Sequence, residues 1–188
     1  MPGKLKMSSV FAVALVFAFV AGSALAEDLA ATSCGAGGAS TQFTVTGDGV
    51  SHSGMVFKAT DLAKLPQTTV QEVYTSGKGM QGPTEYGGVL LWDVLNKAGL
   101  ENPSTKTRKN AWGAFYVLVT GTDCYQQAFS VAELNPALGG ASQTTVAYGK
   151  SVPALDGFAR LIPPGDKGGD RTVYNVMSIQ VIDGYKLP

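Results

Sequence analysis

A dense group of turn-forming and charged residues at positions 160–171 places the strongest limit on how this chain can fold. Pro163 and Pro164 remove two adjacent backbone donors, and Gly165 and Gly168 permit positive φ, so the segment is expected to be a loop whose backbone can approach another group closely. The β-branched run at 173–182 that follows predicts a long strand. The sequence therefore predicts a glycine-rich, cationic loop at the mouth of a sheet.

Two interpretations of this loop stay open. Asp166 and Asp170 can cancel the charges of Lys167 and Arg171, which is typical of a solvated hairpin loop. Alternatively, backbone N–H groups and cationic side chains together form an anion-binding site. The candidate residues for that site are Arg160, Gly165, Lys167, Gly168 and Arg171.

Residues 1–26 have the features of a secretory signal peptide. Lys4 and Lys6 precede an apolar block at 10–20, and Ala24–Ala26 has the small-x-small pattern that signal peptidase cuts. The apolar block is short for a membrane anchor, which is the competing interpretation. We expect the mature protein to be periplasmic or secreted, with no membrane span after cleavage.

The remaining length and charge predict one domain and exclude one class of partner. Residues 27–40 are rich in Ala, Gly, Ser and Thr and predict a flexible linker, so that 41–188 forms a single domain. The whole chain has 14 Lys and Arg against 14 Asp and Glu. No basic stretch with interleaved aromatic residues is present, so nucleic acid is not an expected partner.

Two cysteines, Cys34 and Cys124, are the only ones in the chain. An even number in an oxidising compartment favours a disulfide between them, and two free thiols are the alternative. The chain lacks CxxC and CxxCH motifs and has one histidine, so haem attachment and cysteine-rich zinc sites are excluded.

The order of patterns along the chain predicts an α+β domain dominated by sheet. The clearest helix is expected within 86–99, where Leu91, Val94, Leu95 and Ala98 lie on one face and Gly99 ends it. The glycine-rich segment 76–83 is expected to be a loop. Strands are expected at 43–45, 55–57, 68–74, 114–120, 125–130 and 144–148, and short helices at 60–65 and 131–134.

No residue can be assigned a catalytic role from the sequence. His52 has no Asp, Glu or Cys at ligand spacing and is expected to be an exposed strand residue, and no nucleophile–base pair stands out. Tyr86, Trp92 and Tyr125 are the candidates for apolar or stacking walls of a pocket.

Three blocks, taken together, resemble the sulfite-oxidase-type molybdopterin-binding domain. They lie at 86–99, at 117–134 and at 160–169, in the order and at the separations that the family has. The resemblance runs from about Phe43 to Asp183. It implies a mixed α+β fold of twisted sheets and a few short helices, with a pterin pocket walled by loops at strand ends.

The same resemblance implies that the metal ligand is missing. Metal-loaded members hold molybdenum through a cysteine thiolate just ahead of the helix block, and residues 72–79 contain no cysteine. Thr75 or Ser76 offers only a hydroxyl in its place. Asp156 and Gly157 stand where the family has His-Gly ahead of the Arg-Leu-x-x-Pro segment. Of the pterin contacts, Arg160 carries over, and Lys167 and Arg171 less directly.

Export adds a second expectation about the cofactor. Exported enzymes resembling this family cross the membrane folded, on a twin-arginine signal, whereas this n-region has no arginine. We therefore expect a binding or accessory module without molybdenum that binds a small anionic ligand or an extracytoplasmic protein partner. The alternative is a molybdopterin-dependent oxidoreductase of the sulfite-oxidase type, in which Cys124 replaces the lost ligand.

Overall fold

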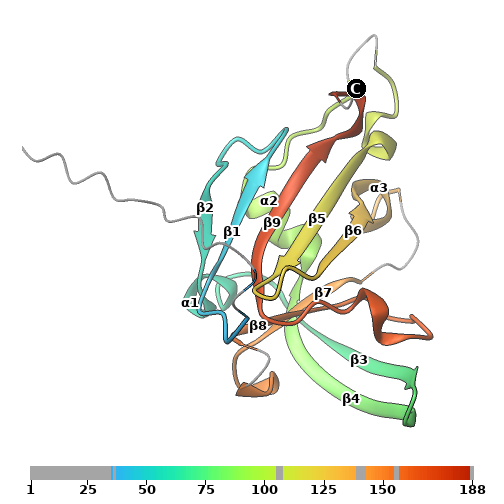
Figure 1. Cartoon of the computed structure of the whole chain (residues 1–188). Helices are drawn as coiled ribbons and strands as arrows, with labels where there is room; N and C mark the ends of the chain where they lie inside the picture. The colour runs from blue at the N-terminus through green and yellow to red at the C-terminus, as the bar shows by residue number, and fades with distance from the viewer. Residues whose placement is uncertain (1–34, 36, 105–107, 139–142, 155–156, 187–188) are drawn as a thin grey trace, which may run out of the picture. The chain divides into compact units, whose positions relative to one another are not determined.

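The computed structural model describes residues 35, 37–104, 108–138, 143–154 and 157–186 (Figure 1). The predicted signal peptide, Cys34 and the first part of the predicted linker lie outside these residues. All of the described residues belong to one unit of the chain, Ala31–Pro188.

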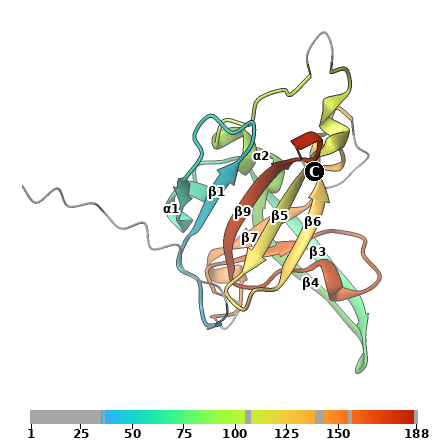
Figure 2. The ribbon, with the colours of Figure 1, turned by 45° about the horizontal axis from the view of Figure 1, so that its top comes forward.

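A five-stranded sheet runs through the unit in the order β2-β1-β9-β5-β6 (Figures 1 and 2). β1 and β9 are parallel neighbours, and the other neighbouring pairs are antiparallel. Its strands alternate apolar residues toward the core, as Val117 and Val119 of β5 and Ile179 and Val181 of β9 do. The strand bounds are β1 Phe43–Gly47, β2 Met55–Phe57, β5 Phe115–Gly121, β6 Gln126–Ser130 and β9 Val176–Asp183.

A second, four-stranded antiparallel sheet has the order β3-β4-β7-β8. β3 and β4 form a long hairpin whose far end extends away from the other strands (Figure 1). The strand bounds are β3 Gln67–Ser76, β4 Gly79–Leu90, β7 Thr145–Tyr148 and β8 Ala159–Ile162.

The main core lies between the five-stranded sheet and the helix α2, Leu91–Lys97, with the inner ends of β4, β7 and β8 beside it. Leu91, Val94 and Leu95 of α2 are fully buried there, as their helical spacing predicts. The short helices are α1 Ala59–Leu62 and α3 Val131–Leu134, and single 3-10 turns lie at Ala111–Ala114, Gly149–Ser151, Gly169–Arg171 and Gly184–Lys186.

Two predictions about local structure were wrong. Residues 76–83 are the turn of the hairpin and the first part of β4, because a two-residue turn at Gly77 and Lys78 lets Ser76 and Gly79 pair. Arg160 lies within β8 and not in the loop that follows. The helix expected within 86–99 is confirmed as α2, and residues 86–89 ahead of it pair with β3.

The remaining expected strands and short helices are confirmed within a few residues of their predicted bounds. Helix α1 begins one residue before Thr60, because the Asp61 carboxylate accepts the Lys58 N–H and sets the helix start.

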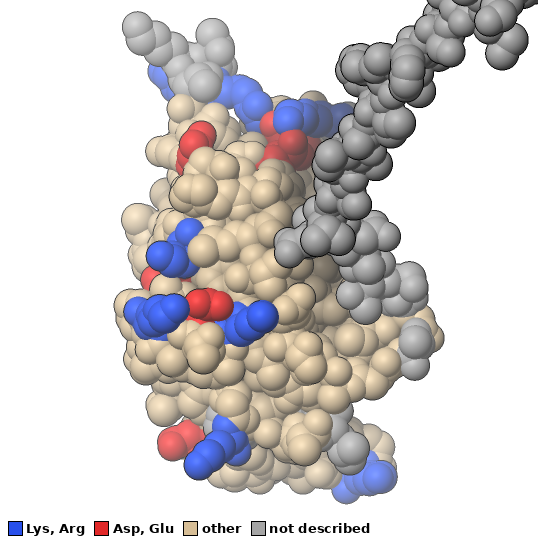
Figure 3. Space-filling model, turned by 90° about the vertical axis from the view of Figure 1, so that its left-hand side faces the viewer, with Lys and Arg blue, Asp and Glu red and all other residues tan. Residues whose placement is uncertain are grey.

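Within the described residues, no helix has the length and the apolar character that crossing a membrane requires. The face that carries β2 and α1 is largely uncharged, and its Lys and Arg are interspersed with Asp and Glu (Figure 3).

Candidate functional site

A cleft of about 450 Å³ lies between β3 and the loop that follows β8. A second hollow of about 10 Å³, large enough for one water molecule, adjoins it. The volume of the cleft, the larger of the two hollows, is within the size range of small-molecule sites. The cleft is lined by Gln71, Val73, Tyr74, Thr75, Met80, Gly165, Asp166 and Lys167.

Arg160 forms a buried ion pair with Glu72 at the base of this region. One terminal guanidinium nitrogen donates to both carboxylate oxygens of Glu72, at 2.6 and 2.7 Å. Arg160 is 4% exposed and Glu72 is 8% exposed, so water solvates and screens neither charge effectively. The ion pair joins β8 and β3, which are the two edge strands of this sheet and are separated by β7 and β4.

Two tyrosines and a threonine complete the surroundings of this pair. The Tyr86 and Tyr174 hydroxyls accept hydrogen bonds from Arg160 at 2.9 and 2.8 Å, and both rings lie within 5.1 Å of the guanidinium carbon. Thr172 donates to Glu72 at 3.1 Å. The charge of Arg160 is therefore balanced inside the protein.

Arg171 is also balanced by a carboxylate. It makes two parallel hydrogen bonds of 2.8 Å to Asp166, and a longer contact of 3.5 Å to Glu133. The hydrogen bonds to Asp166 raise the pKa of Arg171 above its usual value. This pair closes the 166–171 loop upon itself, as the solvated-loop interpretation predicts for these two residues.

Lys167 differs from the two arginines. Its side chain is exposed and lines the larger hollow, and it takes part in none of the ion pairs formed among the described residues. Its backbone carbonyl accepts the Thr75 N–H at 2.9 Å, which fixes the loop against β3. Lys167 is thus the cation that the cleft offers to an incoming group.

The other residues expected at the site lie in three separate places. Gly165 and Gly168 lie in the loop, and both line the hollows. Tyr125 lines neither hollow, and its hydroxyl donates to the Asp170 carbonyl. Trp92 also lines neither hollow and packs edge-on against Trp112, with ring centroids 5.9 Å apart.

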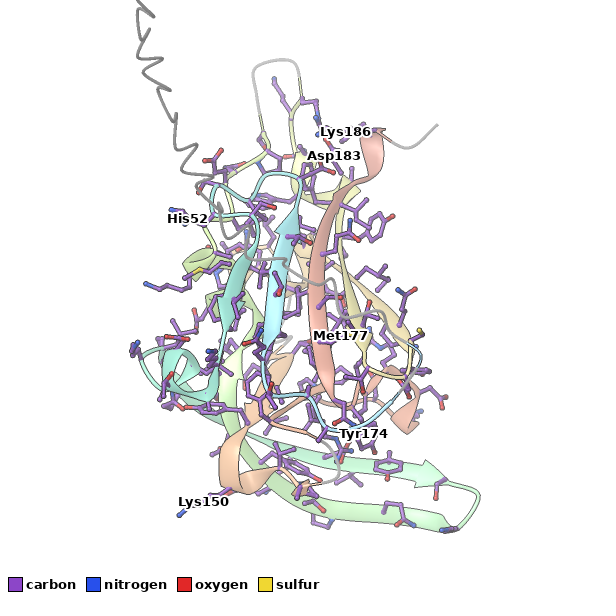
Figure 4. The ribbon with its side chains drawn as sticks, turned by 60° about the vertical axis from the view of Figure 1, so that its left-hand side comes forward. His52, Lys150, Tyr174, Met177, Asp183 and Lys186 are labelled. Carbon is purple, nitrogen blue, oxygen red and sulfur yellow. The ribbon has the colours of Figure 1, made fainter. Side chains whose placement is uncertain are left out.

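The donor set does not fit a molybdenum atom held by a thiolate. Neither hollow is lined by a cysteine, and Cys124 is in the turn between β5 and β6. Within the described part of the chain, His, Cys, Asp and Glu form no group of three that can hold a metal ion. His52 is exposed as expected, but it lies in the turn between β1 and β2 and not in a strand, far from the β3–β4 hairpin (Figure 4).

Several residues of this region were not predicted. The sequence did offer a clue to Glu72. Val70 and Glu72 lie two residues apart in the expected strand, so their side chains point to the same face, and a charged residue on a buried face needs a partner. The sequence offered no such clue to Tyr174 and Met80, since their positions depend on how the hairpin pairs and on the path of the loop. The residues missed are Gln71, Glu72, Val73, Tyr74, Met80, Thr172 and Tyr174.

Comparison with known proteins supports the fold. No family model and no curated protein matches this chain. Among solved structures, the sulfane dehydrogenase SoxCD from Paracoccus pantotrophus is similar, with a TM-score of 0.56 and 21% sequence identity. The match covers 76% of this chain and 38% of that chain. The predicted α+β fold of the sulfite-oxidase molybdopterin-binding type, with mixed twisted sheets and few short helices, is thereby confirmed.

Proposed function

We propose that this chain is an extracytoplasmic binding or accessory module that holds no molybdenum and takes a small anionic group in the cleft between β3 and the 163–169 loop. The observation that carries the proposal is the position of Lys167. It lines the cleft without an ion-pair partner among the described residues, while Glu72 and Asp166 neutralise Arg160 and Arg171.

The walls of the cleft add an apolar component to this anion site. Val73 is 42% exposed and Met80 is 75% exposed, although both are apolar, and both line the cleft beside Lys167. Exposed apolar side chains next to a cation suit a ligand that combines a hydrophobic part with a negative charge. Gln71 and Thr75 supply neutral hydrogen-bonding groups.

A molybdopterin-dependent oxidoreductase is the second candidate, and the fold shared with a sulfane dehydrogenase favours it. The residues present argue against it, because the pterin-binding arginine of the resemblance is already paired with Glu72 and no thiol lines the cleft.

A matched pair of probes tests the anion site. Flavin mononucleotide and riboflavin share a ring system and differ in one phosphate, so calorimetric titration with both isolates the contribution of the charge. We expect flavin mononucleotide to bind roughly tenfold more tightly, and Lys167→Gln to remove that difference.

Lys97→Gln is the control, since Lys97 is an exposed lysine on α2 that lines neither hollow. It should leave both affinities unchanged. Equal affinity for the two probes, or an unchanged preference in Lys167→Gln, would refute the anion site.

A further inference from the structure

The edge of β3 that faces the cleft presents backbone groups to it. β3 is at the end of its sheet, with β4 on its other side. The Thr75 N–H points away from β4, because it donates to the Lys167 carbonyl at 2.9 Å. In a strand, the N–H and C=O groups of every second residue point to the same side. The N–H and C=O groups of Val73 and Gln71 therefore also point away from β4.

A β-bulge interrupts the pairing of β3 with β4 near Val73, but it does not change the two-residue repeat of β3. The register moves from Glu72 opposite Thr84 to Tyr74 opposite Gln81, so the extra residue belongs to β4 and β3 stays regular. Within the described residues, no hydrogen bond joins the outward N–H of Gln71 or Val73 to another part of the chain. These two residues therefore form an open strand edge, and both line the hollows.

The protein already pairs one extended residue with this edge. Gly168 forms a parallel bridge with Thr75, next to the hydrogen bond from Thr75 to Lys167. Ahead of this contact, Pro163 and Gly165 line the smaller hollow together with Gln71 and Val73, and Pro163 has no N–H to give to the edge. The cleft borders the same stretch of β3, since Gln71, Val73 and Thr75 all line it.

The spacing of these groups selects the kind of occupant. Outward backbone groups at Gln71 and Val73 are about 6.8 Å apart, the two-residue repeat of another strand. We infer that the occupant of the cleft is an extended, acidic peptide segment that adds to β3 as a further strand, with a carboxylate at Lys167. This inference rests on the proposed function and names the chemical class of its anionic ligand.

A synthetic peptide tests the inference on the full mature chain. The probe is an acetylated hexapeptide of alternating valine and threonine that ends in glutamate, and its control carries N-methyl groups on alternate backbone amides. We expect the probe to bind and to slow hydrogen exchange at the Gln71 and Val73 amides. We expect the methylated control to bind at least tenfold more weakly.

Two proline variants locate the binding edge. Val73→Pro removes one outward donor without removing a hydrogen bond to β4, because that N–H points away from β4, and it should weaken peptide binding roughly tenfold. Thr69→Pro is the control, since Thr69 has the same parity on β3 but lines neither hollow. It should leave peptide affinity unchanged.

The outcomes separate this inference from the proposed function. Binding of flavin mononucleotide through Lys167 without binding of the peptide refutes the inference and leaves the anion site standing. Equal binding of the methylated control also refutes it. Protection of the Gln71 and Val73 amides by self-association, seen as a dimer in sedimentation without any peptide, would assign the edge to a second copy of this chain.

Discussion

Arg160 and Glu72 face one another inside the protein, with a guanidinium nitrogen 2.6 and 2.7 Å from the two carboxylate oxygens. The resemblance to molybdopterin-binding domains implies that this arginine contacts a pterin or its phosphate. In this chain a carboxylate from β3 takes the place of such an anion. The arginine therefore serves as a structural link between β8 and β3.

Removal of Glu72 should destabilise the fold strongly. Glu72→Gln leaves the Arg160 charge buried without its counter-charge, which should lower the free energy of unfolding by about 3 kcal/mol or more. Urea denaturation measures this loss. Glu85→Gln, an exposed change in the same hairpin, should cost less than about 0.5 kcal/mol.

A double variant separates the buried charge from the lost contact. Glu72→Met combined with Arg160→Met removes both charges, so it should be more stable than Glu72→Gln alone. Equal loss in the double and single variants would contradict the view that an unbalanced charge causes the effect.

The junction between β4 and β7 should tolerate only glycine at position 88. A Cβ on Gly88 would lie 2.4 Å from the Val146 carbonyl oxygen, which belongs to a buried strand and cannot move freely. Gly88→Ala should lower the free energy of unfolding by about 2 kcal/mol or more. Gly113→Ala, where a Cβ meets open space, should change it by less than about 0.5 kcal/mol, and similar losses in both variants would count against the packing argument.

Most of the fold could be predicted from the spacing of apolar residues that are close to one another in the sequence. The alternation in β5 and the helical spacing of Leu91, Val94 and Leu95 each report burial directly, and the structure confirms them. The glycine-rich hairpin was missed because its pairing comes from β3, whose β-branched residues supply the strand preference that residues 76–83 lack.

The site was harder to predict than the fold, for a physical reason. The loop composition of Gly165, Lys167 and Gly168 identified one wall of the cleft. The opposite wall depends on tertiary pairing, and the charge of an arginine says nothing about its counter-charge. Arg160 and Arg171 were thus expected to face a ligand, although carboxylates of the same chain bind both.

The contact between Asp48 and Lys186 should make stability depend on acid. Lys186 donates to Asp48 at 2.6 Å and the Asp183 N–H donates at 3.1 Å, and these hydrogen bonds, that of Lys186 above all, lower the pKa of Asp48 below 3.8. Lys186 and Asp183 lie together at the end of β9 (Figure 4). The stabilisation is present above pH 3.8 and is lost as pH falls through the lowered pKa.

Thermal unfolding of the unmodified protein and Asp48→Asn should show this dependence. The unmodified protein should have the higher midpoint near neutral pH, and the difference between the two should shrink at pH values well below 3.8. A difference that stays constant with pH would show that the carboxylate charge of Asp48 is irrelevant.

The position of Gly35 predicts a Cys34–Cys124 disulfide. The Gly35 N–H donates to the Thr122 carbonyl at 2.9 Å, and a Cβ on Gly35 would lie 3.7 Å from the Cys124 sulfur. Cys34 precedes Gly35 in the sequence, and consecutive Cα atoms are about 3.8 Å apart. Peptide mapping without reductant should recover the two cysteines in one linked fragment.

Reduction supplies the second readout for the disulfide. Because the predicted disulfide closes a long loop, its reduction should lower the free energy of unfolding by about 4 kcal/mol in the chain-entropy model, and Cys34→Ser should have a similar effect. Two thiols that react in the native, unreduced protein would contradict the pairing.

The molybdenum content of the natively purified protein distinguishes a metal-free module from a molybdopterin-dependent oxidoreductase. The protein has a molybdopterin-binding fold, but its Arg160 is bound to Glu72 and no thiolate lines its cleft. Elemental analysis of protein taken from its own compartment should therefore find far less than one molybdenum atom per chain. One firmly bound molybdenum atom per chain would contradict a metal-free module.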